Sequence, residues 1–454
     1  MKEECGIFGT YQKEKSFNTS NYVINGLSDI QHRGQESSGI SYFTNKGLTV
    51  FKNMGLVKEV FSNYTSNNTN MCIGHVRYST SKSSISSLED AQPFRGSHLL
   101  GEFSIVHNGH IPNLDKNKHI RKEDYSTDSD FLVKYIERST LTSWENILID
   151  IMNTIPGVYC LLVMTCDSIY VLRDRYGIRP LCIGRNKEGI YVSSESCAIE
   201  YCDFIVDVEP GQILQINDNI YSIYKYPSEN LHCIFEFIYF SNSKSILDGC
   251  NVENIRKDFG RKLAQQDLYL FDKNSIVVGS PSSGILAGKG YAEESGLQYK
   301  QVLIKNKDYI RSFIMPNQKE RLNICQNKFK LDIDTSGYLK DKTIILVGDS
   351  IVRGNTMKHI VSMFLKEGVK EIHVRSASPP IKYPCYFGID ISSSNELIAN
   401  RVLYYDGLAK YFNSTSLDYL TQKNIEDTIH KYAPKMGLCG ACFNGNYEDK
   451  LLNW

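Results

Sequence analysis

The sequence predicts a two-domain protein whose second domain is of the α/β class, with helices packed on a parallel sheet. The chain has 454 residues, which is long for one domain and comfortable for two. Hydrophobic residues make up 41% of it, enough for a normal core. A strand–loop–helix–strand pattern occupies residues 343–375, whereas the chain up to about residue 228 alternates short strands and turns. We therefore place the domain boundary near Tyr226-Pro227-Ser228.

The first half combines short strands with a few helices. Apolar residues recur at helical spacing over residues 23–30 and 128–139, which predicts two helices with one buried face each. Residues 160–165 and 169–173 are short apolar runs separated by a polar turn. Such runs predict two paired, buried strands.

The second half contains a clear βαβ unit. Residues 343–347 form a β-rich apolar run, and a polar loop with glycines follows over residues 348–356. Residues 357–365 then carry apolar side chains at helical spacing, Gly368 ends the helix, and residues 371–375 form the next strand. A βαβ unit predicts a parallel sheet.

The composition excludes several classes of protein. Lys plus Arg and Asp plus Glu both number 51, so the net charge of +0 removes the usual electrostatic argument for a nucleic-acid binder. Apolar runs stay well short of the roughly 18 residues of a membrane span, and the first residues lack the apolar stretch of a signal peptide. We expect a cytoplasmic protein whose 13 cysteines serve thiol chemistry or metal ligation rather than disulfides.

The segment Cys5-Gly6-Ile7-Phe8-Gly9 has two interpretations. In the first, Cys5 is a small buried residue that opens a strand. In the second, residues 1–4 are removed and Cys5 becomes an N-terminal nucleophile. Its free α-amino group, with a reference pKa of about 7.7–8.0, would then serve as the general base of the thiol.

Other polar segments favour the second interpretation. Arg77 is suited to gripping a carboxylate, and the Asn108 amide and the Gly109 N–H are the two donors that an oxyanion hole requires. Ser126-Thr127-Asp128 caps a predicted helix, and Asp128 could also hold a substrate ammonium. Together with the cysteine, these groups describe a glutamine amidohydrolase.

The loop of the βαβ unit predicts a phosphate site. Residues 346–356 place backbone N–H groups at a helix N-terminus, and Asp349 ahead of them can take ribose hydroxyls or help hold Mg²⁺. The alternative is an ordinary turn between strand and helix. Residues 279–284 have P-loop-like glycine spacing, but Ile285 stands where a P-loop needs lysine, which excludes that motif.

Cys439 and Cys442 form a C-x-x-C pair. By itself such a pair is either a redox couple or half of a zinc site.

Taken together, the motifs resemble the amidophosphoribosyltransferases, a family of class II (N-terminal nucleophile) glutamine amidotransferases. The segments that carry the resemblance are Cys5-Gly6-Ile7-Phe8-Gly9, His32-Arg33-Gly34-Gln35-Glu36-Ser37, His75-Val76-Arg77-Tyr78-Ser79-Thr80, Ala91-Gln92-Pro93-Phe94, His107-Asn108-Gly109 and residues 173–181. Residues 346–356 resemble the phosphoribosylpyrophosphate signature of type I phosphoribosyltransferases. The resemblance runs from Cys5 to about Tyr447.

The resemblance implies a domain plan and a reaction. Residues 1–4 would be a propeptide, residues 5–228 a four-layer αββα glutaminase domain, and residues 229–454 a type I phosphoribosyltransferase domain with a C-terminal cluster-ligating segment. The reaction would be glutamine-dependent amidation of phosphoribosylpyrophosphate to 5-phosphoribosylamine, the committed step of purine synthesis. A homo-oligomer, specifically a tetramer, and inhibition by purine nucleotides are implied as well.

The resemblance also implies roles for individual residues. Cys5 would be the nucleophile, Asn108 and Gly109 the oxyanion hole, and Arg77 and Asp128 the glutamine-binding residues. The residues expected to bind phosphoribosylpyrophosphate are Lys305, Asp349, Ser350, Arg353, Gly354, Asn355 and Thr356, with Asp349 and Ser283 assisting Mg²⁺.

Four cysteines match the ligand positions of the iron–sulfur-containing branch of the family. They are Cys233, Cys385, Cys439 and Cys442, and four thiolates suit a 4Fe–4S cluster, with zinc as the physical competitor. The other cysteines are expected to be buried packing residues: Cys72, Cys160, Cys166, Cys182, Cys197, Cys202, Cys250 and Cys325.

The chain departs from the family pattern mainly in the phosphoribosyl half. Gly348 stands where an aspartate is usual, Ser282 replaces another aspartate, residues 242–245 read Asn-Ser-Lys-Ser, and Gln326 replaces an arginine. Lys305, Asn306, Arg311 and Lys328 are retained in the pyrophosphate loop. The alternative function is therefore a divergent homologue with a decayed phosphoribosyl site, acting as a glutaminase only or as a non-catalytic regulatory protein.

Overall fold

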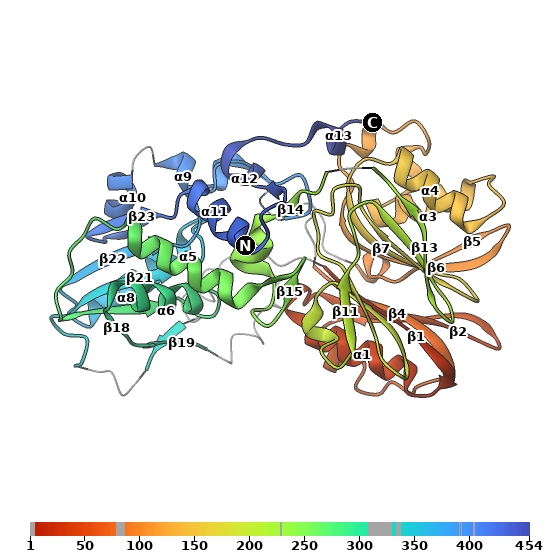
Figure 1. Cartoon of the computed structure of the whole chain (residues 1–454), viewed down its shortest axis with the longest axis horizontal. Coiled ribbons are helices and arrows are strands. Elements are labelled where there is room, and N and C mark those ends of the chain that lie inside the picture. Colours follow the sequence, from red (N-terminus) through yellow and green to blue (C-terminus); the bar gives the residue numbers. More distant parts are fainter. Residues whose placement is uncertain are drawn as a thin grey trace.

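The computed structural model describes residues 5–78, 87–227, 229–306, 329–332, 337–389, 391, 393–402 and 405–454. Two domains lie side by side in Figure 1, the first from red to yellow-green and the second from green to blue. The proposed propeptide of residues 1–4 lies outside the described residues, as do Arg311, Cys325, Gln326 and Lys328.

The first domain stacks two antiparallel sheets. The seven-stranded sheet has the order β11-β9-β10-β1-β4-β2-β3, and the six-stranded sheet has the order β13-β12-β8-β7-β6-β5. The strands of the first are β1 (Gly6–Ser16), β2 (Ser37–Thr44), β3 (Gly47–Met54), β4 (Thr69–Arg77), β9 (Cys182–Arg185), β10 (Gly189–Ser193) and β11 (Phe204–Asp207). Those of the second are β5 (Phe94–His98), β6 (Gly101–His110), β7 (Val158–Met164), β8 (Ile169–Arg173), β12 (Gln212–Ile216) and β13 (Ile220–Lys225).

Alternation along the strands builds the layers. In β7, Cys160 and Leu162 face the core between the sheets, whereas Leu161 and Val163 face the opposite side. That outer side is covered by α3 (Asp128–Arg138) and α4 (Trp144–Thr154). The outer face of the other sheet packs on α1 (Thr19–Asp29), and the short α2 (Val57–Val60) lies beside it. The predicted αββα sandwich is thus confirmed.

The second domain is built on a parallel sheet of five strands with the order β18-β17-β21-β22-β23. Its strands are β17 (Ser275–Gly279), β18 (Gln298–Tyr299), β21 (Thr343–Gly348), β22 (Glu371–Ser376) and β23 (Ser416–Tyr419). One face packs on α5 (Val252–Gln266) and α6 (Gly284–Ser295), the other on α8 (Asn355–Lys366) and α10 (Tyr405–Phe412). A Cβ on Gly260 would lie 1.9 Å from the Ala287 carbonyl oxygen, so glycine lets α5 and α6 touch.

The remaining elements are short or lie near the C-terminus. They are β14 (His232–Cys233) with β24 (Leu438–Cys439), β15 (Ile246–Leu247) with β16 (Cys250–Asn251), β19 (Leu303–Lys305) with β20 (Phe329–Leu331), α9 (Ile398–Arg401), α11 (Gln422–Tyr432), α12 (Ala441–Asn444) and α13 (Asp449–Leu452). Figure 1 shows α13 and the chain end returning to the first domain. There the Trp454 indole N–H donates to the Pro112 carbonyl over 2.9 Å.

The elements predicted from periodicity are all present. The helix expected over 128–139 is α3, the paired strands are β7 and β8 in antiparallel register, and the βαβ unit is β21, α8 and β22. Gly368, with φ +74°, follows the end of α8 as expected of a helix stop. Within the residues described, no helix is long and apolar enough to cross a membrane.

Candidate functional site

Cys5 lies directly before β1, at the edge of the first domain that faces the second. Its thiol contacts the Tyr78 carbonyl oxygen at 3.6 Å, and its own carbonyl accepts a hydrogen bond from Arg33 Nε at 3.2 Å. The adjoining strand is held on both sides, because β1 pairs with β4 and β10. The nucleophile predicted from the sequence therefore lies on a rigid strand end and is half-buried.

The two predicted oxyanion donors lie on β6, in the neighbouring sheet. Asn108 is buried, and its side-chain amide donates to the Ser194 hydroxyl over 3.5 Å. The same hydroxyl accepts the Ile7 backbone N–H at 3.0 Å, two residues after Cys5. Gly109 has φ +152°, and a Cβ there would lie 2.0 Å from the Val158 carbonyl oxygen, so this position requires glycine. Ser194 thus connects the strand of the nucleophile to Asn108, a link that the sequence pattern did not indicate.

Asp128 begins α3 and holds its carboxylate beside β6. Thr127 is the N-cap, as predicted, and accepts the Asp130 N–H. The Ile111 N–H donates to Asp128 Oδ2 over 3.1 Å, and His110 Nδ1 lies 3.3 Å from the same oxygen. Burial alone would raise the pKa of Asp128, but the neighbouring histidines and this N–H outweigh burial and hold it well below its ordinary range. The carboxylate is therefore charged, as an acceptor for an ammonium group must be.

Arg77 lies at the end of β4 and is already engaged with carboxylates. Its Nη1 lies 3.1 Å from Glu36 Oε2, and its Nη2 lies 3.9 Å from Asp90 Oδ2. The side chain is 11% exposed. Glu36 therefore orients the Arg77 guanidinium that is expected to bind the substrate carboxylate.

A buried ionic network behind Cys5 crosses the domain boundary. Arg33 is buried, with Nη1 2.6 Å from Glu195 Oε1 and Nη2 2.8 Å from Glu236 Oε1. Glu195 belongs to the first domain, and Glu236 begins a π-helical segment of the second (Glu236–Phe240). Glu195 Oε2 also accepts the Asn242 N–H at 2.7 Å and the Ser245 hydroxyl at 2.6 Å. The backbone N–H of Asn242 and the hydroxyl of Ser245 therefore join the stretch 242–245 to Glu195 of the first domain.

The predicted phosphate loop follows β21 at the carboxyl edge of the parallel sheet. Gly354 caps α8 with φ +79°, a conformation that favours glycine, and leaves Asn355 and Thr356 exposed in the first helical turn. Arg353 is turned toward Glu396, with Nη2 2.6 Å from its carboxylate. A helix end of this kind presents backbone N–H groups that can bind an anion.

Asp349 is the centre of a polar cluster in this loop. The Ser283 hydroxyl donates to one carboxylate oxygen, and the Ser350 hydroxyl donates to the other over 2.6 Å. Ser283 comes from the neighbouring β17–α6 turn, so the structure brings together the two residues predicted to assist Mg²⁺. Arg256 also lies within electrostatic range of Asp349, and burial lowers the pKa of this arginine to about 10.

Lys305 is not brought into this cluster. It is exposed at the end of β19, on a two-stranded ribbon separate from the five-stranded sheet. No hydrogen bond or ion pair joins its side chain to the loop in the described part of the chain.

The four cysteines predicted to bind a cluster come together although they are far apart in sequence. Cys233 and Cys439 are direct partners in the parallel β14–β24 pair. Cys442 follows in α12, and its carbonyl oxygen accepts the Lys382 and Tyr383 N–H groups, which precede Cys385. Burial raises the pKa of Cys442 well above its ordinary value, and Cys385, Cys233 and Cys439 raise it further. Burial likewise raises the pKa of Cys439 to about 11.

Four thiols are the donor set of an iron–sulfur cluster and also of a tetrahedral zinc site, so the residues present fit either group. In the described residues, no group of three or more His, Cys, Asp or Glu side chains is arranged to hold a single ion. A 4Fe–4S cluster places four irons and four sulfides between its cysteines, so its ligands stand farther apart than those of one zinc ion. No disulfide joins any of the twelve described cysteines.

Three of the cysteines expected to be buried are not fully buried. Cys166 is exposed rather than buried, because it lies in the turn between β7 and β8, past the last residue of the apolar strand. Cys72, Cys160, Cys182 and Cys250 are buried as expected, and Cys197 and Cys202 are half-buried.

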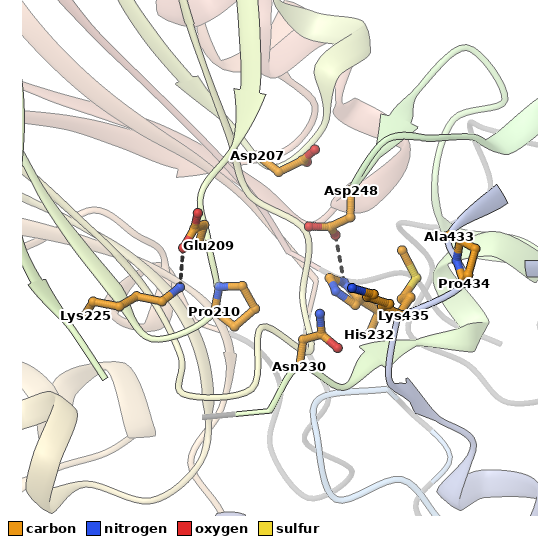
Figure 2. Close-up of a pocket in the computed structure, with 11 residues that line it drawn as sticks. Asp207, Glu209, Pro210, Lys225, Asn230, His232, Asp248, Ala433, Pro434 and Lys435 are labelled. Carbon is orange, nitrogen blue, oxygen red and sulfur yellow. Dashed lines mark hydrogen bonds and ion pairs between the residues drawn. The ribbon is translucent and has the colours of Figure 1, made fainter. Parts of the chain in front are cut away.

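A further cavity of about 590 Å³ lies at the domain boundary (Figure 2). Its walls include Asp207, Asp248 and His232 on one side and Glu209 paired with Lys225 on the other. Asp248 is paired with His232 at 2.7 Å and with the buried Arg173, so its charge is already balanced within the protein. No predicted site residue lines this cavity.

Comparison with known proteins gives the chain a family. Residues 75–201 match the family model described as a glutamine amidotransferase domain. The chain is 36% identical to the amidophosphoribosyltransferase of Methanocaldococcus jannaschii, with 98% of each protein covered, and 35% identical to that of Bacillus subtilis, with 99% of this chain and 95% of the relative covered.

Solved structures agree with these relatives. The glutamine phosphoribosylpyrophosphate amidotransferase of Bacillus subtilis, complexed with ADP and GMP, has a TM-score of 0.86 and 35% identity, with 98% of this chain and 97% of that one covered. A structure described as the allosteric regulatory enzyme of purine biosynthesis has a TM-score of 0.87 at 35% identity, with 98% of this chain and 96% of that one covered. These matches include the second domain, so the alternative of a decayed homologue gains no support. With relatives above 30% identity along nearly all of its length, the chain belongs to the amidophosphoribosyltransferase family.

Proposed function

We propose that this enzyme performs the glutamine-dependent amidation of phosphoribosylpyrophosphate with Cys5 and Asp349 at the centres of its two half-sites. The observation that carries the proposal is the pairing of two sites in one molecule. Cys5 stands at the start of β1, next to the strand of the oxyanion donors, in one domain, and Asp349 stands at the end of β21 with Ser283 and Ser350 in the other.

In the first half-reaction, the Cys5 thiol attacks the side-chain amide carbon of glutamine. Once residues 1–4 are removed, the α-amino group of Cys5 takes the thiol proton and then gives it to the departing ammonia. The Asn108 amide and the Gly109 N–H stabilise the oxyanion of the tetrahedral intermediate, and water hydrolyses the resulting thioester to glutamate. Asp128 receives the substrate ammonium, and Arg77 receives the substrate carboxylate.

In the second half-reaction, ammonia attacks C1 of phosphoribosylpyrophosphate and pyrophosphate leaves, which gives 5-phosphoribosylamine. Backbone N–H groups over residues 350–356 receive the 5-phosphate. Lys305 is assigned to pyrophosphate on the family resemblance alone, because it lies on the separate β19–β20 ribbon. The oxygen donors Asp349 and Ser283 suit Mg²⁺, which is commonly held by one or two carboxylates together with substrate phosphates. Transfer inside the protein keeps ammonia unprotonated and therefore nucleophilic.

The four thiols of Cys233, Cys385, Cys439 and Cys442 would hold a 4Fe–4S cluster. Bound there, the cluster would supply structural cross-linking rather than redox chemistry, because it would join the start of the second domain to its C-terminal segment. An iron and sulfide count near four each per chain supports this assignment, whereas stoichiometric zinc without iron overturns it.

Regulation has support from the names of the relatives, whereas assembly is inferred from the family resemblance alone. The structure of the Bacillus subtilis relative was solved with ADP and GMP, and another neighbour is described as an allosteric enzyme of purine biosynthesis. We infer that purine nucleotides inhibit this enzyme and that it forms a homo-tetramer. Inhibition of pyrophosphate release by adenine and guanine nucleotides tests the first inference. The native mass of the protein tests the second.

One assay tests the reaction. Anaerobically purified protein is given phosphoribosylpyrophosphate and Mg²⁺ with either glutamine or ammonium chloride, and glutamate and pyrophosphate are measured. Pyrophosphate release with both nitrogen sources is the expected result. Glutamate release without pyrophosphate would overturn the second half-site. The intact mass of the active protein decides whether residues 1–4 are removed.

A further inference from the structure

The segment Ala91-Gln92-Pro93-Phe94 has no role in the reaction as described so far. It leads into β5, which begins at Phe94, and Gln92 is only 5% exposed. The backbone of Gln92 is packed against β2, where a Cβ on Gly39 would lie 2.4 Å from the Gln92 carbonyl oxygen. The backbone from which the Gln92 side chain extends is therefore fixed against β2.

The side-chain amide of Gln92 binds both backbone polar groups of one residue on β6. Its Oε1 accepts the His107 N–H at 2.7 Å, and its Nε2 donates to the His107 carbonyl oxygen over 3.2 Å. The β5–β6 ladder ends at the pair Phe94 and Ile105, so His107 lies beyond the last paired residue on that side. The carboxamide thus takes the place of the peptide group that a longer β5 would present.

This contact lies next to the oxyanion donors. His107 immediately precedes Asn108 and Gly109 on β6. On the other side, β7 pairs with the same stretch, with Asn108 opposite Cys160 and Gly109 opposite Tyr159. Gln92 therefore completes the support of β6 at the point where the strand must place two donors accurately.

The same amide group reaches the glutamine-binding helix. Gln92 Nε2 donates to the Ser129 hydroxyl over 3.1 Å, and His107 Nδ1 lies 3.0 Å from that hydroxyl. The Ser129 backbone N–H donates to Asp128 Oδ1 over 2.9 Å. Three of the four hydrogen-bonding capacities of one side-chain amide are thus used to join β6 to the start of α3.

We propose that Gln92 is a positioning residue that sets the spacing between the oxyanion donors Asn108 and Gly109 and the ammonium acceptor Asp128. This inference rests on the roles proposed above for those three residues. Its physical basis is that oxyanion stabilisation and near-attack geometry depend on placement to within about 1 Å. A buried amide that is bonded to both elements transmits any change in one to the other.

The test compares Gln92→Met with wild type in the full-length enzyme. Methionine has a similar length and removes all three hydrogen bonds. Removal of one oxyanion donor lowers kcat about 10²- to 10³-fold. Misplacement of the donors should cost less than their removal, so we expect kcat for glutamine hydrolysis to fall about 10- to 100-fold. Pyrophosphate release with ammonium chloride should stay within about twofold of wild type, because that reaction does not use β6.

Two further variants keep the result interpretable. Gln92→Asn retains the amide on a shorter side chain and replaces the first variant in the test if Gln92→Met folds poorly. It should also lower kcat for glutamine hydrolysis, because the shorter side chain cannot reach His107 and Ser129 together. Gln12→Met is the matched control, because Gln12 is a buried glutamine that bonds to Thr10 away from the site. In this variant the glutamine-dependent and ammonium-dependent activities should fall together or not at all.

The outcomes separate this inference from the proposed function. If Asn108→Ala leaves glutamine kcat unchanged, the oxyanion assignment itself fails. If Asn108→Ala lowers glutamine kcat but both Gln92 variants keep wild-type kcat and KM, the positioning role is wrong. An equal loss of glutamine- and ammonium-dependent activity in Gln92→Met and Gln92→Asn would also overturn it, because a merely structural residue gives that pattern.

Discussion

The two candidate sites differ in how completely the protein itself holds their groups. In the first domain, Asn108 and Asp128 are held by hydrogen bonds with neighbouring elements. The strand β1 pairs on both sides, and β6 pairs with β7 beside Asn108. In the second domain, Asp349 has two serine partners, but Asn355 and Thr356 are exposed at the start of α8.

The difference follows from the substrates. The glutamine amide is neutral and acquires charge only in the transition state, so its donors must be placed beforehand by the protein. Phosphoribosylpyrophosphate brings its own negative charges, and backbone N–H groups at a helix N-terminus suit such a ligand without a prebuilt side-chain cage. This is consistent with a second site that carries Gly348 and Ser282, where the family pattern leads us to expect aspartates.

The largest expected effect comes from Cys5→Ala, which separates the two sites. Removal of a catalytic nucleophile lowers kcat by roughly 10⁶-fold, so glutamine-dependent activity should vanish. Pyrophosphate release with ammonium chloride should persist, because the second domain receives ammonia from solution. Loss of both activities in a folded variant would contradict the separation of the half-sites.

The next effect concerns the buried network that joins the domains. Glu195→Gln leaves Arg33 with one carboxylate fewer in a buried position, and breaking a buried pair costs about 3–5 kcal/mol of unfolding free energy. Denaturant unfolding at pH 7 measures this loss. The matched control is Glu209→Gln, in the exposed pair with Lys225, where we expect less than about 1 kcal/mol.

The same network predicts a pH dependence of stability. Burial alone would raise the pKa of Glu195, but His32 and Arg33 outweigh burial and hold it well below its ordinary range. A carboxyl whose pKa is lower in the folded state contributes stability above its unfolded pKa of about 4.3, and this is lost as pH falls toward the folded value. Wild-type stability should therefore fall more steeply below about pH 4.3 than that of Glu195→Gln. Equal slopes would show that this carboxyl is not held in its charged form.

A smaller effect is expected from Asp349→Asn, in the second site. Hydrogen bonds to a charged group contribute about 1.5–3 kcal/mol, so pyrophosphate release should fall about 10- to 100-fold with either nitrogen source. Cysteine-dependent glutamine hydrolysis should continue. If only glutamine-dependent pyrophosphate release fell, Asp349 would act in communication between the sites rather than at the phosphoribosyl group.

Gly348→Asp tests the same site by adding a carboxylate instead of removing one. A Cβ at this position meets only the end of the Met357 side chain, at 3.0 Å, which is flexible enough to move. The variant should fold, and the added carboxylate should lower the Mg²⁺ concentration that gives half-maximal pyrophosphate release. An increase in that concentration would show that the loop has adapted to glycine.

The sequence predicted the elements that have strong periodicity and the residues that lie inside compact motifs. Thus α3, β7, β8 and the βαβ unit were found, and Asn108, Gly109 and Asp128 lie together as expected. Glu195 and Glu236 were missed because their bonds to Arg33 span 162 and 203 residues, and one sequence carries no signal for such pairs. Cys166 was assigned to the core because it adjoins an apolar run, yet the turn begins just before it.

The smallest effect concerns Trp454, where the second half of the chain touches the first site. Its ring packs edge-on against Phe131 of α3 at 5.6 Å, and its N–H binds the Pro112 carbonyl, one residue after the Ile111 N–H that bonds to Asp128. Loss of one such hydrogen bond costs about 1 kcal/mol, so Trp454→Phe should raise KM for glutamine about fivefold while ammonium-dependent activity stays constant. Trp144→Phe is the matched control, because it is the other of the two tryptophans and packs at Phe103. If both variants changed KM equally, the effect would come from the shared helical layer and not from the contact beside Asp128.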